Sequence, residues 1–140
     1  MTDRTPVRAI AALVASALLL LGVLGFVPGI TTHYGELHFA GRASHARLFD
    51  VFRVSILLDL VHVLSGLAGL ALARTAAGAR TFLVDGGAAY LGLWLLGAVA
   101  AGGWIPLNAG DNWLHFAGGL AMLALAFVTT RERTHAAPAA

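Results

Sequence analysis

Four apolar runs, each close to the length needed to cross a lipid bilayer, dominate this sequence of 140 residues. A transmembrane helix needs roughly 20 mostly apolar residues, and the runs cover residues 9–27, 54–73, 82–101 and 113–128. Charged residues make up only 11% of the chain, about half the share that is typical of soluble domains. The sequence therefore predicts an all-α membrane protein, with four transmembrane helices in a single domain over residues 1–140.

The segments outside the apolar runs are short or polar. Residues 30–53 are predicted to form an extracytoplasmic loop, in which residues 46–53 mix apolar and charged side chains. That mixture is typical of an interfacial lead-in to the second span. The three His and one Glu of this loop match no closed zinc pattern, so it is interpreted as an ordinary solvated loop. Residues 134–140 are predicted to be a disordered tail.

The second and fourth runs share a polar motif that is unusual in apolar sequence. An acid or amide, a His and a Gly recur at the same offsets fifty-three positions apart, as Asp59, His62, Gly66 and Asn112, His115, Gly119. A stripe of small residues in the first run recurs seventy-five positions later in the third. The two halves therefore look like copies of one helical hairpin, giving a parallel repeat about an axis normal to the membrane.

Glycines at helical spacing mark the faces on which the spans are expected to pack. Small residues let helix backbones approach closely in a membrane. The predicted helix-packing residues are Gly22, Gly66, Gly69, Gly97 and Gly119. Of these, Gly66 and Gly119 are expected to mark the closest approach of the second and fourth helices.

Ionisable groups inside apolar spans are costly and are functional hypotheses by default. The polar cluster Asp59, His62, Asn112 and His115 has four interpretations. The first is interhelical hydrogen bonding, with at least one bond between the second and fourth helices. The second is a b-type haem held by His62 and His115, which close packing at the glycines disfavours. The third is a proton or small-cation pathway, and the fourth is an accessory subunit that docks through a lipid-facing Gly or Ala groove.

Other chemistry finds little support in the sequence. Ser55 shares a helix face with Asp59 and His62, but its hydroxyl lies too far along that face for a catalytic triad. No catalytic residue is predicted, and the pattern favours a protein without enzymatic activity. The absence of Cys excludes a thiolate metal site and a disulfide framework, so no metal or cofactor is expected.

The distribution of charge predicts the orientation of the chain. All nine basic residues are Arg, and more of them flank the termini and the turn after the second run than lie in residues 30–53. The positive-inside rule then places both termini in the cytoplasm. With the abundant Ala and Gly, this composition is typical of a bacterial inner membrane protein. The expected partners are the lipid bilayer and a homo-oligomer or larger membrane complex, whereas a net charge of +2 gives no support for nucleic acid.

Several segments resemble a bacterial family of four-helix membrane proteins that is catalogued as domain of unknown function 4383. The resemblance rests on GVLGFVPGITT at residues 22–32, the loop pattern of residues 34–41, VSILLDLVHVLSGLAG at residues 54–69 and DNWLH at residues 111–115. It covers nearly the whole chain and implies a fold and a membrane location without an activity. This chain has Leu58-Asp59 where members often have His-Asn, so it lacks that additional His.

Overall fold

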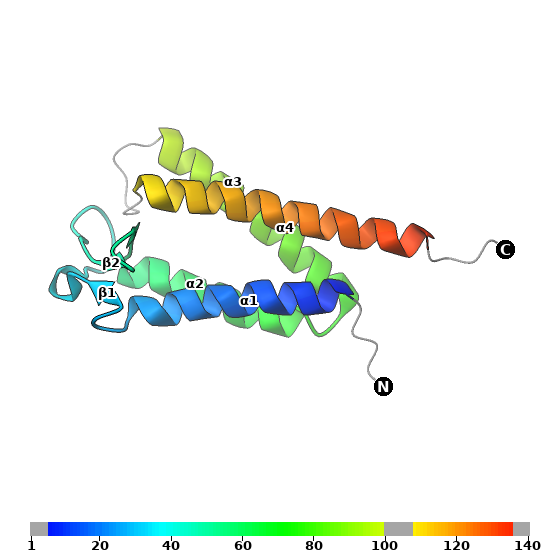
Figure 1. Cartoon of the computed structure of the whole chain (residues 1–140), viewed down its shortest axis with the longest axis horizontal. Coiled ribbons are helices and arrows are strands. Elements are labelled where there is room, and N and C mark those ends of the chain that lie inside the picture. Colours follow the sequence, from blue (N-terminus) through cyan, green and yellow to red (C-terminus); the bar gives the residue numbers. More distant parts are fainter. Residues whose placement is uncertain (1–5, 100–107, 136–140) are drawn as a thin grey trace.

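The computed structural model describes residues 6–99 and 108–135, and this part of the chain is mostly helical. Its four helices are α1 (Pro6–Gly25), α2 (Ile56–Leu72), α3 (Ala76–Val99) and α4 (Ala109–His135). All four run along the long axis of the molecule, with α3 crossing obliquely (Figure 1). The start of α1, the end of α4 and the turn between α2 and α3 lie at one end, called the turn end below. A small sheet lies at the opposite end, called the sheet end.

Three helices of the described chain are long and apolar enough to cross a membrane, namely α1, α3 and α4 over Ala109–Thr129. The remaining helix, α2, is also apolar but has only 17 residues. Many large apolar side chains on the helix surfaces are exposed, among them Leu13, Leu20, Leu64, Leu67, Trp113 and Phe127. Lipid is the medium in which such a surface is stable, so the helices identify a membrane protein.

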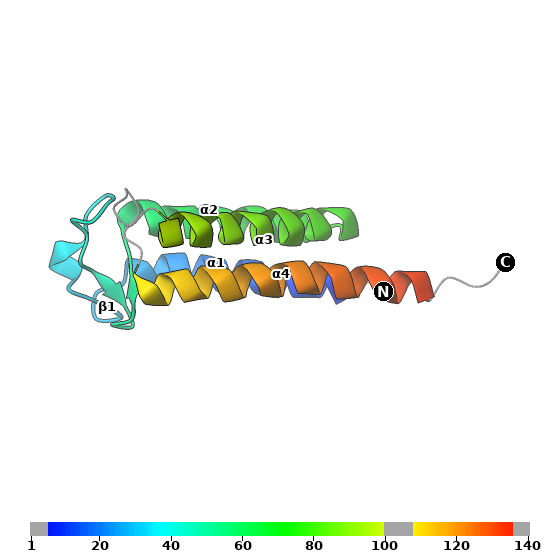
Figure 2. The same ribbon diagram turned by 90° about the horizontal axis from the view of Figure 1, so that it is seen from above.

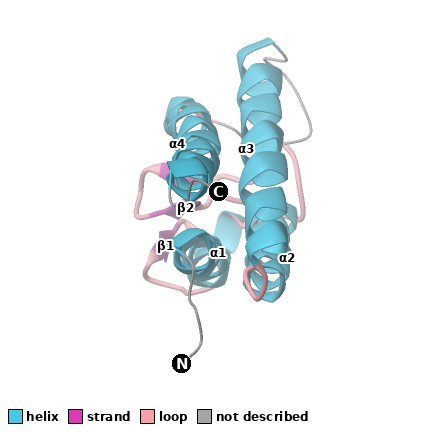
Figure 3. Cartoon of the chain, turned by 90° about the vertical axis from the view of Figure 1, so that its right-hand side faces the viewer, coloured by secondary structure: helices cyan, strands magenta, loops and turns pink. Residues whose placement is uncertain are grey.

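The helices form two hairpins that pack across two layers. Helix α1 packs along α2, and α3 packs along α4, each much more extensively than one hairpin packs on the other. In the two views turned by 90° (Figures 2 and 3), α1 and α4 form one layer, while α2 and α3 form the other. Helices α2 and α4 therefore lie on a diagonal of the bundle and do not pack along one another.

Small residues bring the partners of each hairpin into backbone contact. The predicted stripe of α1 is buried in full, at Ala11, Ala15, Leu18, Gly22 and Gly25. A side chain at Gly66 would lie 2.5 Å from the backbone nitrogen of Leu19 in α1, and one at Gly119 would lie 2.9 Å from the carbonyl oxygen of Gly87 in α3. The prediction that these two glycines join the second and fourth helices was wrong, because each packs against the other helix of its own hairpin.

The two hairpins use the same kind of contact at registers that differ by one turn. Gly69 of α2 meets Ala15 of α1, whereas Met122, its counterpart in α4, meets Gly86 of α3. Position 86 is four residues before Tyr90, which is the counterpart of Ala15 in the proposed repeat. Four residues correspond to about one helical turn. The second hairpin is thus packed one turn out of step with the first.

The turn end is closed by apolar packing and by two arginines. Its core combines α1, α3 and α4 with the end of α2, through Val7, Ala11, Ala15, Leu18, Ala73, Ala79, Phe82, Leu83, Met122 and Ala126. Arg8 donates from Nε to the carbonyl oxygen of Ala73 at 3.2 Å, and Arg80 donates from Nη2 to that of Thr129 at 3.4 Å. In each hairpin, an Arg on one helix therefore holds the end of the other.

Residues 30–53 were predicted to be a solvated loop with an interfacial lead-in, and the structure corrects this. They contain a three-stranded antiparallel sheet of β1 (Thr31–Thr32), β2 (Arg47–Leu48) and β3 (Phe52–Arg53), with a 3₁₀ helix, η1 (Tyr34–Glu36), between β1 and β2. Phe49 and Asp50 have φ angles of 53° and 60°. Positive φ at two successive residues is typical of a hairpin turn that matches the twist of the strands.

Polar side chains of this segment form hydrogen bonds with nearby backbone carbonyl groups. The Ser44 hydroxyl donates to the carbonyl oxygen of Val54 at 2.6 Å, and that of Thr31 donates to the carbonyl oxygen of Leu24 at 3.1 Å. Ala46, Leu48 and Val54 form a small buried cluster between the sheet and the ends of α1 and α2. At the other terminus, α4 continues to His135, two residues into the segment expected to be disordered, while residues 136–140 lie outside the described chain.

Candidate functional site

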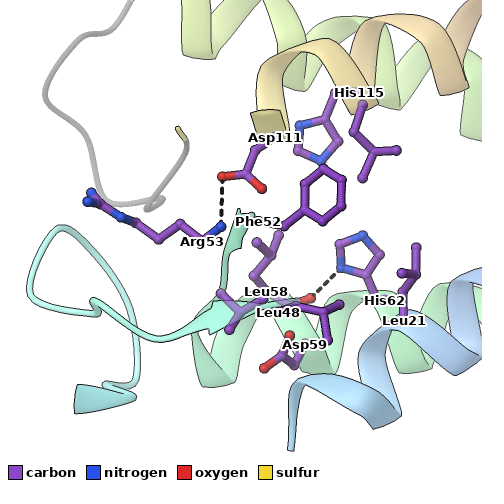
Figure 4. Close-up of a pocket in the computed structure, with 11 residues that line it drawn as sticks. Leu21, Leu48, Phe52, Arg53, Leu58, Asp59, His62, Asp111 and His115 are labelled. Carbon is purple, nitrogen blue, oxygen red and sulfur yellow. Dashed lines mark hydrogen bonds between the residues drawn. The ribbon is translucent and has the colours of Figure 1, made fainter. Parts of the chain in front are cut away.

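A polar pocket lies at the sheet end, between the two hairpins. Its volume is about 20 Å³, which is room for one water molecule. Apolar side chains from α1, α2, α4 and the sheet form most of its wall. Five residues with charged or ionisable side chains line it, namely Arg53, Asp59, His62, Asp111 and His115 (Figure 4).

Asp59 contributes a buried carboxyl group near the start of α2. The helix begins after Ser55, whose hydroxyl caps it by accepting from the backbone N–H of Leu58 at 3.2 Å. Asp59 is only 2% exposed, and its carboxyl group lies against Gly25 at the end of α1, where any side chain would displace it. Within the described chain its Oδ2 atom has no hydrogen-bond partner. Leaving such an atom unpaired costs roughly 1–3 kcal/mol.

A tyrosine from α3 contacts both histidines. The ring of Tyr90 meets the imidazole of His62 edge to face, with centroids 6.4 Å apart, and that of His115 with centroids 5.1 Å apart. His62 Nδ1 lies 2.8 Å from the carbonyl oxygen of Leu58. Because a carbonyl only accepts, Nδ1 of His62 must carry a hydrogen, and Nε2 of the neutral ring is left as an acceptor.

His115 is the more enclosed of the two imidazoles. Its side chain is 2% exposed, and its Nδ1 atom has no partner among the described residues. A ring nitrogen can donate or accept depending on protonation, so this atom can bond either to a water or to a carboxyl group. Three residues that line the pocket therefore have a buried polar atom without a partner in the described chain, namely Asp59 (Oδ2), His115 (Nδ1) and Arg53 (Nε).

Asp111 ties the start of α4 to the sheet. Its Oδ2 accepts from the backbone N–H of Asn108 at 2.7 Å and from that of Arg53 at 3.3 Å. The Asn108 side chain accepts in return from the Asp111 backbone N–H at 2.9 Å and donates to the carbonyl oxygen of Val51 at 2.7 Å. This is the reciprocal arrangement of a capping box, and its Asn108 member also holds the β2–β3 turn.

The structure divides the predicted polar cluster. Asp59, His62 and His115 line one pocket, but Asn112 does not. Asn112 instead lies against Gly97 of α3, within the second hairpin, and its Oδ1 atom is buried without a partner in the described chain. No hydrogen bond joins α2 to α4 within residues 6–99 and 108–135. The expected bond between those helices is therefore absent, because the helices lie on a diagonal.

Four residues at the site were not proposed from the sequence. Tyr90 belonged to the predicted stripe of the third span, but nothing in the pattern indicated that its ring contacts both histidines. Asn108 and Asp111 carried a usable signal, since a capping residue followed three positions later by an acid before an apolar run is typical of a helix start. Arg53 reaches the pocket only because residues 47–53 form a β-hairpin.

The geometry limits the chemistry that this pocket can support. Among the described residues, no group of three or more His, Asp and Glu side chains is arranged to hold a metal ion. The pocket offers instead one unpaired carboxyl oxygen, one unpaired imidazole nitrogen and space for a single water. Such a set can hold a water molecule and can share a proton between its carboxyl and imidazole groups.

One comparison with known proteins identifies a family. A family model described as a domain of unknown function, DUF4383, matches residues 8–128. This range includes every residue of the pocket and all four helices over most of their length. Comparison with curated proteins and with solved structures gave no match.

Proposed function

The chain belongs to the DUF4383 family, whose description names no activity, and from that premise we propose a function based on the pocket itself. The protein is a four-span accessory protein of the bacterial inner membrane. Its pocket binds a water molecule and a proton at the extracytoplasmic face. The observation that carries this proposal is the pair of unpaired buried atoms, Asp59 Oδ2 and His115 Nδ1, that line one water-sized cavity.

The four-span topology is supported by the pairing of the helices. Helix α2 has 17 residues, which is the lower limit for a span, and it returns alongside α1, a helix long enough to cross. A sheet that bonds to the starts of α2 and α4 at one end, together with Arg-rich ends at the other, fits an outward-facing sheet end and cytoplasmic termini. The matching Arg contacts of the two hairpins support a duplicated hairpin.

Proton binding explains the pocket better than interhelical bonding does. If the cluster existed to join helices, its polar atoms would bond to one another, yet Asp59, Asn112 and His115 each have an atom without a partner in the described chain. Buried polar groups in native proteins nearly always have a partner, including ordered water. A water molecule in the pocket can pair with such atoms, and a proton taken up from the aqueous phase neutralises the buried carboxylate.

The site binds a proton without conducting it. The pocket lies at the sheet end, and the apolar core at the turn end includes Leu18, Leu83 and Met122 and blocks a path along the bundle axis. Proton movement through such a core would require a chain of polar groups. The protein therefore acts as an accessory subunit that responds to extracytoplasmic pH, and no enzymatic step is proposed for it.

The haem alternative is weaker in this geometry. Bis-His ligation requires the two imidazoles to face one another across the macrocycle, but the pocket that His62 and His115 line has a volume of only about 20 Å³. Helices α2 and α4 lie further apart than the close-packing argument expected. This separation does not leave room for a macrocycle between the two histidines. We propose that the protein uses no haem.

Infrared spectroscopy of the reconstituted protein tests proton binding at Asp59. The difference between wild type and Asp59→Asn isolates the C=O band of this carboxyl group, which is expected to appear as the external pH is lowered. Asp50→Asn is the matched control, since Asp50 lies exposed in the β2–β3 turn. His115→Gln should shift the midpoint of the Asp59 band, because it replaces the imidazole that shares the water.

Two results would overturn the proposal. One is an Asp59 band that does not change over the pH range in which the protein stays folded. The other is a titration midpoint of the Asp59 band that His115→Gln does not change, just as the exposed control Asp50→Asn does not. Helix content from circular dichroism, measured on the same samples, shows whether each variant remains folded.

A further inference from the structure

The lipid-facing side of α3 carries an acidic residue that has no partner in the described chain. Asp85 is exposed, and it makes no hydrogen bond or ion pair with any described residue. It lies within a helix that is apolar and long enough to span a membrane, Ala76–Val99. Acidic residues inside such helices almost always face the bundle interior or pair with another group, and Asp85 does neither within one copy of the chain.

Asp85 lies well inside α3 rather than at its turn-end terminus. Arg80 marks the turn end of α3, where it bonds to the carbonyl oxygen of Thr129, the last residue of the α4 span. Asp85 lies five residues further along the helix, about 7.5 Å deeper. A side chain at its neighbour Gly86 would meet Met122, which lies in the core of the bundle. Long basic side chains can extend to the interface from such a depth, but Asp is too short.

Asp85 belongs to a regular exposed stripe. Residues spaced four and three apart along α3 are all exposed, and they run opposite the face that contains buried Phe82, Leu83 and Gly87. The stripe consists of Thr81, Asp85, Ala88, Gly92, Leu95 and Val99. This spacing is the one by which two helices pack along a seam. At its centre, a side chain at Gly92 would meet nothing within 4 Å, so another backbone can approach there.

We propose that this stripe binds a second copy of the same chain, as a parallel pair of α3 helices related by a two-fold axis normal to the membrane. A second copy presents the same stripe at the same depth, as a two-fold interface requires. It brings the Thr81 hydroxyl and the Asp85 carboxyl group of the partner beside Asp85. The Thr81 hydroxyl can donate to a carboxyl oxygen, and the partner's Asp85 can do so when it is protonated; lipid offers no such donor.

The composition of the stripe fits this occupant in two further ways. Ala88 and Gly92 allow the close backbone approach on which helix association in membranes depends. A single polar residue in an apolar seam also fixes the register of the two helices, so Asp85 would align the copies level with one another. The inference does not depend on the pocket, which lies on the other side of α3 and is lined by no residue of this stripe.

Disulfide cross-linking in native membranes tests the interface directly. The chain contains no Cys, so single-Cys variants need no further change. Ala88→Cys and Gly92→Cys should form dimers of the 14.5 kDa chain on mild oxidation, because disulfides require close Cβ atoms. Ala89→Cys is the matched control, since Ala89 is an exposed alanine of the same helix that lies about 100° around it.

The expected result is a dimer yield several-fold higher for Ala88→Cys than for Ala89→Cys. Equal yields would overturn the proposal, and so would cross-linking of Ala88→Cys only to a protein of another mass. Asp85→Asn and Asp85→Leu are then added to Ala88→Cys. Asn can still hydrogen-bond across the seam and should preserve the yield, whereas Leu should lower it several-fold. A yield unchanged by Leu would refute the role given to Asp85.

Discussion

Replacing Gly66 by Ala tests whether backbone contact holds the first hairpin together. The new methyl group would lie 2.5 Å from the Leu19 nitrogen and 2.6 Å from its Cβ atom, whereas ordinary contact begins near 3.4 Å. Helices α1 and α2 must therefore separate locally by about 1 Å. Overpacking of this kind costs roughly 1–3 kcal/mol, and the better helix propensity of Ala returns roughly 0.5–1 kcal/mol. The expected net loss of unfolding free energy is about 1–2 kcal/mol.

Two matched variants allow the expected changes in unfolding free energy to be ranked. Gly119→Ala meets the Gly87 carbonyl oxygen at 2.9 Å and the end of the Leu91 side chain, which can move, so its loss should be smaller. Gly92→Ala meets nothing within one copy and should gain roughly 0.5–1 kcal/mol in monomeric detergent samples. Unfolding in mixed micelles, followed by circular dichroism, measures all three. If Gly66→Ala proves as stable as Gly92→Ala, then α1 and α2 are not in backbone contact.

Three further predictions concern topology, cofactor and local stability. A membrane-impermeant thiol reagent applied to intact cells should label Ala43→Cys, at an exposed position of the sheet end, but not Ala77→Cys in the first turn of α3; the reverse pattern would invert the orientation. The purified protein should be colourless, and a Soret absorbance lost in both His62→Ala and His115→Ala would contradict this. Asn108→Ala should lower the unfolding free energy by about 1 kcal/mol through the lost cap, and an unchanged unfolding midpoint would show that the cap does not stabilise α4.

The helices were predictable because their signals are local. Apolar runs of sufficient length locate α1, α3 and α4, and the small-residue stripe of α1 identifies its buried face residue by residue. A stripe shows only that a face packs, however, and does not identify the partner helix. For that reason Gly66 was assigned to the wrong neighbour: sequence identity between the second and fourth runs suggested contact, whereas duplication only makes the two helices alike.

The sheet and the pocket depended on contacts between distant residues. Two-residue strands such as Arg47–Leu48 are too short to show an alternating pattern, and the positive φ angles of Phe49 and Asp50 occur at residue types for which they are uncommon. Three residues of the motif, Asp59, His62 and His115, line one pocket. The motif could not predict that a register change of one turn leaves Asn112 outside, nor that Tyr90 of α3 contacts both histidines.

The uneven packing of the four helices has a mechanical consequence. Each hairpin is held along its length by backbone contacts, while the apolar core that joins the hairpins lies at the turn end, where Ala73, Arg74 and Thr75 connect them. Each hairpin can therefore act as a stiff arm that pivots at that connection, within the limits set by the hydrogen bonds of Asp111 and Asn108 to the sheet end. Over an arm of about 25 Å, the length of α2, a rotation of about 5° moves the far end by about 2 Å. That displacement is comparable to the radius of a water molecule, so a small pivot at the turn end changes the width of the pocket by an amount that matters to its occupant.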